Sequence, residues 1–134
     1  MLRRDLLTAE IKKLAEALAR ILHLKTEGKT EEADQKLMDL LQNEYNLSDA
    51  DLQAMDGTEF LAFLKTSAFP AEKLDVLSQI LYSIFDPALS NPKNRSLAVK
   101  LGQIYQLLIT EHRTINMINL DREDVVKKYL STNS

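Results

Sequence analysis

The chain has 134 residues, no cysteine, a formal net charge of −3 and an apolar fraction of 45%. This length is typical of one domain, so we expect residues 1–134 to form a single domain. The lack of cysteine excludes a disulfide framework, and no run approaches the ~18 consecutive apolar residues of a membrane span. Arg3-Arg4 is followed by a charged segment rather than an apolar one, which argues against a secretion signal. We therefore expect a cytoplasmic protein that does not enter a membrane.

Charge is distributed unevenly along the chain. Residues 1–29 carry seven basic and four acidic side chains (+3), residues 30–75 carry three and eleven (−8), and residues 76–134 carry seven and five (+2). An acidic middle segment repels phosphate backbones. The sequence thus disfavours nucleic-acid binding through a broad basic face.

The first third of the chain predicts two helices joined by a short turn. Apolar side chains recur every three or four positions in residues 3–27, which predicts a long amphipathic helix that ends at Gly28. Thr30 is expected to be the N-cap of a second helix, with Ala33 and Leu37 on its apolar face. Because only about two residues separate the helices, they should fold back as an antiparallel hairpin.

Caps and prolines divide the rest of the chain into further helices. The expected starts are Ser48, Asp56 or Thr58, Pro70, Asn91-Pro92 and Asp121. Residues 114–120 are ambiguous, because their β-branched and Asn side chains weaken a helix; they either extend the preceding helix or form a bend. No alternating segment of useful length appears elsewhere. The sequence therefore predicts an all-α fold of six or seven helices in stacked antiparallel hairpins, with an irregular helical bundle as the alternative.

Part of this pattern is similar to the tetratricopeptide repeat (TPR). Gly28 and Ala33 stand where that repeat has the glycine that ends its first helix and an alanine that packs in its second. The first-helix signature L-G-x-x-Y occurs separately, as residues 101–105, and there the second half of the repeat does not follow. The resemblance implies TPR-like hairpins with a groove for a partner.

The N-terminal pattern also resembles an uncharacterised bacterial family of small helical proteins with a domain of unknown function. The resemblance covers about the first 45 residues. It is carried by Arg4-Asp5, Ile11, Leu14, Leu18, Ile21-Leu22, Leu24-Lys25, Gly28 and Glu32-Ala33. It implies a helical fold and a bacterial origin, and it implies no activity.

Few residues suggest metal, cofactor or catalytic chemistry. His23 and His112 are the only histidines, and their spacing matches no zinc motif. Asp49, Asp51 and Asp56-Gly57 resemble a calcium loop, but the glycine and glutamate that such a loop requires are missing. Three glycines in the whole chain do not provide a phosphate-binding loop. We therefore expect no metal, no cofactor and no enzymatic activity.

The function that this sequence favours is a protein-interaction module, a scaffold or adaptor with an unknown protein partner. By analogy with the repeat, the groove positions are predicted to be Leu18, Leu22, Lys25, Val99, Gln103 and Gln106. The alternative is a regulatory module that binds a small ligand in a pocket between helices.

A homodimer is a further possibility that the first helix raises. Leu6, Ala15, Ala19 and Leu22 flank its main apolar stripe. Either other helices of the same chain cover this wide surface, or the helix packs against its counterpart in a two-fold dimer. In such a dimer Arg3 and Arg4 would meet the acidic segment from Glu31 to Asp56 of the other chain.

Overall fold

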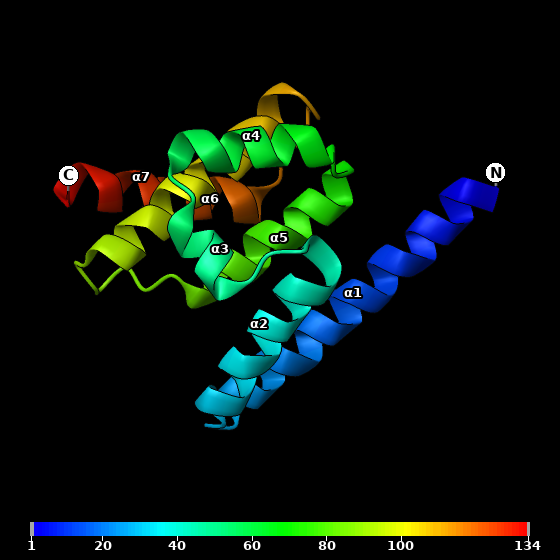
Figure 1. Ribbon diagram of the computed structural model, residues 1–134, viewed down its shortest axis with the longest axis horizontal. Helices are drawn as coiled ribbons and strands as arrows, with labels where there is room; N and C mark the ends of the chain where they lie inside the picture. The colour runs from blue at the N-terminus through cyan, green and yellow to red at the C-terminus, as the bar shows by residue number, and fades with distance from the viewer. Residues whose placement is uncertain (1, 134) are drawn as a thin grey trace. The chain divides into compact units, whose positions relative to one another are not determined.

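The structure is a computed structural model that describes the backbone of residues 2–133 and the side chains of residues 6–133. Within these residues the chain forms seven α-helices and no strand, which confirms the all-α prediction (Figure 1). The helices are α1 (Leu2–Thr26), α2 (Thr30–Tyr45), α3 (Asp49–Ala54), α4 (Gly57–Ser67), α5 (Ala71–Ile84), α6 (Pro92–Thr110) and α7 (Met117–Thr132). They fall into two compact units, the first ending at Ser48 and the second beginning at Asp49. The expected single domain stays a prediction.

The first unit is the antiparallel hairpin of α1 and α2. Gly28 has a φ of +83°, and two backbone hydrogen bonds close the end of α1. The N–H of Lys29 donates to the carbonyl of Leu24 at 3.0 Å, and the N–H of Gly28 donates to that of Lys25 at 3.1 Å. This pair of bonds is the Schellman motif, which favours glycine at the left-handed position.

The expected N-cap at Thr30 is wrong by one residue. Lys29 occupies that position without a side-chain cap, and its carbonyl accepts the N–H of Ala33 at 3.0 Å. Thr30 is the first helical residue because the Schellman turn leaves only Lys29 between Gly28 and the helix.

The two helices of the hairpin differ in length. α1 has 25 residues and α2 has 16, so the N-terminal part of α1 extends beyond the end of α2 (Figure 1). The side chains of Arg3 and Arg4, which the sequence analysis placed in a dimer contact, are not among those that the structure describes. The buried apolar residues recur at helical spacing on both described helices and comprise Leu14, Leu18, Ile21, Ala33, Leu37, Leu41 and Tyr45.

The second unit is built around α6. This helix contacts α4, α5 and α7. Its start matches the prediction from Asn91-Pro92, since the Asn91 side chain accepts the N–H of Asn94 at 2.8 Å. α4 also begins as predicted, with Asp56 accepting the N–H of Glu59 at 2.8 Å in a capping box.

The last helix begins earlier than the sequence suggested, at Met117 rather than at Asp121. Arg113 adopts a φ of +51° in the turn after α6, and the N–H of Thr114 donates to the carbonyl of Leu108 at 2.7 Å. The Asn116 side chain then caps the new helix by accepting the N–H of Asn119 at 2.8 Å. The ambiguous residues 114–120 are therefore a bend followed by the first turn of α7.

Candidate functional site

The hairpin carries a groove between its two helices. Its volume is about 420 Å³, and it is open on one side. The apolar part consists of Ala17, Ile21, Leu24 and Leu40. This volume lies in the range of binding pockets, about 300–1,000 Å³.

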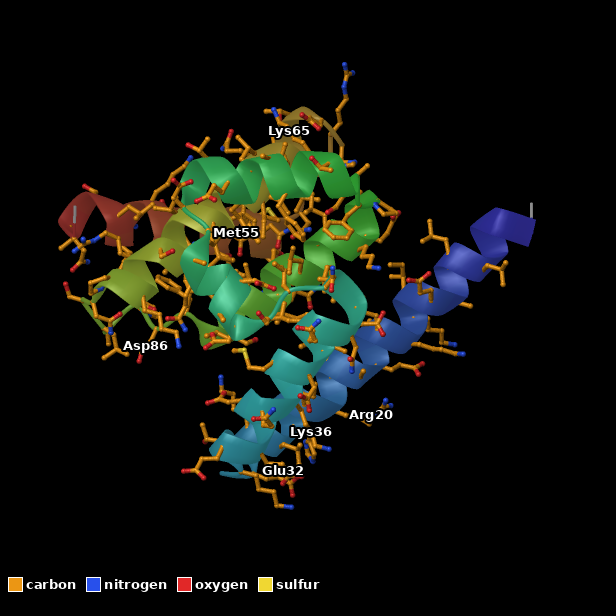
Figure 2. All side chains as sticks on the ribbon, viewed as in Figure 1. Arg20, Glu32, Lys36, Met55, Lys65 and Asp86 are labelled. Atoms are coloured by element: carbon orange, nitrogen blue, oxygen red, sulfur yellow. The ribbon has the colours of Figure 1, made fainter. Side chains whose placement is uncertain are left out.

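Charged side chains of opposite sign line different parts of this groove. Arg20 and Lys36 lie nearer the turn that joins the helices (Figure 2 labels both), whereas the acidic Asp39 and Glu44 lie farther along α2 toward its end. Arg20 and Glu44 make no ion pair with another described residue, and Lys36 makes only a 4.0 Å contact with the exposed Glu32. The groove therefore presents a basic end and an acidic end with largely unpaired charges.

A second pocket lies in the second unit, between the end of α4, the start of α5 and the end of α6. Its volume is about 340 Å³. Leu64, Leu74, Leu107, Ala68 and Phe69 form its apolar part. Lys65, Glu111 and His112 complete the lining, and none of these three side chains is bonded to another described residue.

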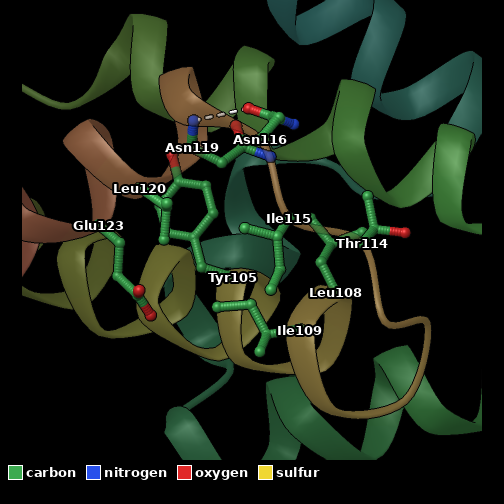
Figure 3. Close-up of a pocket in the computed structure, with 9 residues that line it drawn as sticks. All are labelled: Tyr105, Leu108, Ile109, Thr114, Ile115, Asn116, Asn119, Leu120 and Glu123. Carbon is green, nitrogen blue, oxygen red and sulfur yellow. Dashed lines mark hydrogen bonds between the residues drawn. The ribbon is translucent and has the colours of Figure 1, made fainter.

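A third cavity lies where α6 meets the start of α7 (Figure 3). The Tyr105 ring forms one wall, with Ile109, Ile115, Leu120 and Glu123 around it. Tyr105 is 1% exposed, and its hydroxyl has no hydrogen-bond partner among the residues that the structure describes. Burial raises the pKa of this hydroxyl, so it remains protonated. The cavity volume is about 10 Å³, which is room for one water molecule and not for an organic ligand.

Polar contacts attach the first half of α7 to its neighbours. The Asn119 amide donates to Asp75 of α5 at 2.7 Å, and the Gln106 amide of α6 donates to Glu123 at 2.7 Å. The Arg122 guanidinium lies 4.7 Å from the centre of the Tyr82 ring. These side chains pair with one another, which indicates a structural role in placing α7.

Lys100 is a buried basic residue at the contact of α6 with α4. Its side chain is 1% exposed, donates to the Ser96 hydroxyl and lies 5.9 Å from the centre of the Phe60 ring. Burial lowers the pKa of Lys100 below its ordinary 10.5, and the charge of Asp56 partly offsets this effect. An amine with a lowered pKa is a candidate nucleophile, but none of the described pockets reaches this one.

The predicted partner-binding positions in α1 lie next to the hairpin groove rather than in it. Leu18 is 2% exposed and therefore belongs to the core. Leu22 is half-buried, and Lys25 forms a 3.8 Å ion pair with Asp34 of α2. The groove is lined by Ala17, Ile21 and Leu24, each one position earlier in the sequence.

The predicted positions in α6 are largely engaged in packing. Gln103 donates to the carbonyl of Gly57 at 2.7 Å, and a Cβ added to Gly57 would lie 3.3 Å from a methyl group of Val99. Gln106 is bonded to Glu123. Val99 and Gln103 thus lie at the contact of α6 with α4, and Gln106 at the contact with α7.

The acidic residues that resembled a calcium loop are parts of helix starts. Asp49 opens α3 and Asp56 caps α4. Among residues 6–133 no group of three or more His, Asp or Glu side chains is arranged to hold a metal ion. No described helix combines the length and the apolar character needed to cross a membrane.

The groove and pocket residues that the sequence analysis missed include Arg20, Lys36, Glu44, Lys65 and Glu111. Their helical spacing marks them as surface residues, and nothing in the local pattern distinguishes them from other solvated charges. Comparison of the chain with protein-family models, with curated proteins and with solved structures finds no match.

Proposed function

We propose that this chain is a non-catalytic protein-interaction module that binds an amphipathic helix of a partner protein in the groove between α1 and α2. The observation that carries the proposal is the combination of an apolar floor with unpaired charges of opposite sign along one groove. An amphipathic helix is the peptide element that fits such a surface, with its apolar stripe on the floor.

The charge pattern specifies the orientation of the partner helix. Acidic side chains of the partner would lie near Arg20 and Lys36, and basic side chains would lie near Glu44. Such rim charges contribute to orientation and to the association rate more than to affinity. TPR-like stacking, a bacterial origin and a cytoplasmic location belong to the same proposal and rest on the sequence.

Site-directed photo-crosslinking tests the proposal. A photoreactive side chain at Asn43, which lines the groove, should capture a partner in cells, whereas one at Gln35, which is exposed on α2 outside the groove, should not. The captured segment is then synthesised and titrated against purified wild-type protein and against Arg20→Glu and Leu40→Asp variants. We expect at least a tenfold loss of affinity for Leu40→Asp, about 1.4 kcal/mol. Equal binding by all three proteins would refute docking in this groove.

A second candidate function is the binding of a small amphipathic anion in the pocket between α4, α5 and α6. It is favoured by two of the three unbonded lining side chains, Lys65 and His112, beside an apolar floor, while the third, Glu111, carries the opposite charge. Octanoate is a suitable probe, because its chain matches the floor and its carboxylate matches Lys65. Octanoate should raise the melting temperature of the wild type and not that of Lys65→Glu. A lack of any shift at millimolar octanoate would dismiss this candidate.

A further inference from the structure

The first half of α7 has the reverse of the usual amphipathic arrangement. Its inward side chains are polar, namely Asn119, Arg122 and Glu123, and they are held by the contacts with α5 and α6. Its large apolar side chains face outward. A surface helix normally directs its apolar stripe to the core, so the reversed order indicates that another surface covers the outward side chains.

The outward side chains form what we call the α7 apolar surface, made of Ile115, Met117, Ile118 and Leu120. Their exposed fractions are 64%, 74%, 63% and 40%. Ile115 and Leu120 also line the rim of the small cavity in Figure 3. Each of these four large apolar side chains is at least 40% exposed, and they stand within six residues of one another. Such a concentration differs from the scattered exposure of an ordinary surface.

Two unpaired charges of opposite sign border this surface. Arg113 precedes it in the turn after α6, and Asp121 follows it on α7, one helical turn after Met117. Both side chains are exposed, and neither forms an ion pair within the part of the chain that the structure describes. If a two-fold axis passes near Met117 and Ile118, the end of the surface with Arg113 in one copy lies against the end with Asp121 in the other copy. The surface is therefore complementary to itself in charge.

We propose that the α7 apolar surface binds a second copy of this chain in a two-fold dimer. Arg113 then pairs with Asp121 of the other copy, and the apolar side chains pack across the axis. Asp121 of each copy also lies beside the positive end of the other α7, which favours the same arrangement. Four apolar side chains are few beside the roughly 20–30 residues per partner of a standard interface, so we expect a weak dimer that depends on protein concentration.

This surface is a better candidate for the dimer than the first helix. Among the described side chains of α1, which begin at Leu6, only Leu6 is a large and strongly exposed apolar residue, at 70%. Ala15 and Ala19 are small, and Leu22 is half-buried. The two faces therefore make different predictions for variants. Leu6 provides a matched control, because it is as exposed as Met117 and lies in the other unit.

Sedimentation equilibrium over a hundredfold range of concentration tests the proposal. The apparent mass of the wild type should rise from 15.3 kDa toward twice that value as the protein concentration increases. Ile118→Glu should remain monomeric with an unchanged circular dichroism spectrum, and Leu6→Glu should dimerise as the wild type does. A wild type that stays monomeric overturns the proposal. So does a dimer that Ile118→Glu leaves intact, or one that Leu6→Glu abolishes.

Charge reversal gives a test that depends on the proposed pairing itself. Arg113→Asp and Asp121→Arg should each weaken self-association at least threefold, because each places like charges together twice. The mixture of these two single variants should form a heterodimer, since every pair across the axis is then opposite in sign. Aspartate is also compatible with the positive φ at position 113. If the mixture associates no better than either variant alone, the two-fold pairing is wrong.

Discussion

Gly28 and Gly102 differ in backbone conformation. At both positions an added Cβ would have no neighbour within 4 Å. Gly28 has positive φ at the end of α1, whereas Gly102 lies inside α6. The cost of a side chain at either position therefore comes from backbone conformation and not from collision. Glycine is favoured at the first position and disfavoured at the second.

We expect Gly28→Val to destabilise the protein by about 1–2 kcal/mol, because a β-branched residue is strained in the left-handed region. Gly102→Ala is the matched variant and should stabilise by about 0.5–1 kcal/mol, since alanine favours the helix. Urea unfolding followed by circular dichroism measures both. Equal effects of the two substitutions would mean that α1 does not end at Gly28.

Because Lys100 is buried, its protonation should make the free energy of unfolding depend on pH. The pKa of Lys100 is lowered in the folded protein from its ordinary 10.5, so the unfolded chain binds the proton more tightly. Stability therefore rises with pH between the lowered pKa and 10.5, and below that window the full cost of burying the charge is present.

Replacement of this lysine should remove that dependence. Lys100→Met keeps the length of the buried stem and carries no charge. Raising the pH toward 10.5 should therefore stabilise the wild type relative to the variant, because only the wild type has the buried amine. Urea titrations at several pH values from neutral to alkaline check this. A difference that is constant across the whole range would show that the amine is solvated in the folded protein.

At the scale of helices, periodicity and caps predicted most of the fold. The starts at Asp56, Pro70 and Asn91-Pro92 are confirmed, and so is the end of α1 at Gly28. Each of these signals acts through backbone groups within four residues. The start of α7 was misplaced because Asp121 and Asn116 are both good N-caps, and the choice depends on the contact of Thr114 with Leu108 in the preceding helix.

Substitution of the two competing caps distinguishes them. Asn116→Ala should cost about 1 kcal/mol, because the N–H of Asn119 loses its acceptor. Asp121→Ala should change stability by less than about 0.5 kcal/mol, as for an exposed position inside a helix. Thermal unfolding at low protein concentration, where self-association does not contribute, provides the comparison. A larger loss of stability for Asp121→Ala than for Asn116→Ala would show that α7 begins at Asp121.

The candidate sites were harder to predict than the helices that carry them. The groove of the hairpin lies one position away from the predicted Leu18, Leu22 and Lys25, and a shift of one residue rotates a side chain by about 100° around a helix. The sequence defines an apolar stripe, but which edge of that stripe stays open depends on the partner helix. In the first half of α7 the large apolar side chains even face outward, whereas Val126 and Tyr129 in the second half are buried. The local sequence does not predict this, because the polar contacts that hold the first half, such as Asn119 with Asp75, join residues distant in sequence.

At the scale of the whole molecule, the division into two units qualifies the expectation of one domain. The second unit has its own buried side chains on α4 to α7, including Phe60, Leu77, Ile104 and Val126. The first unit is a hairpin of two helices, and so small a chain buries too little surface to be stable alone. The two units should therefore differ sharply in their ability to fold independently.

We expect the segment from Asp49 to the C-terminus to fold by itself. Its tyrosines give a direct probe, because Tyr82, Tyr105 and Tyr129 lie in this unit, Tyr105 and Tyr129 are buried, and the chain has no tryptophan. The segment should show a near-ultraviolet tyrosine signal that disappears in the same cooperative transition as its helical signal. The segment that ends at Ser48 should show weak helicity without a transition, because a short hairpin without further packing is marginal. If the larger segment has helix but no fixed tyrosine signal, its core depends on α1 and α2, and the chain is then one domain in the thermodynamic sense.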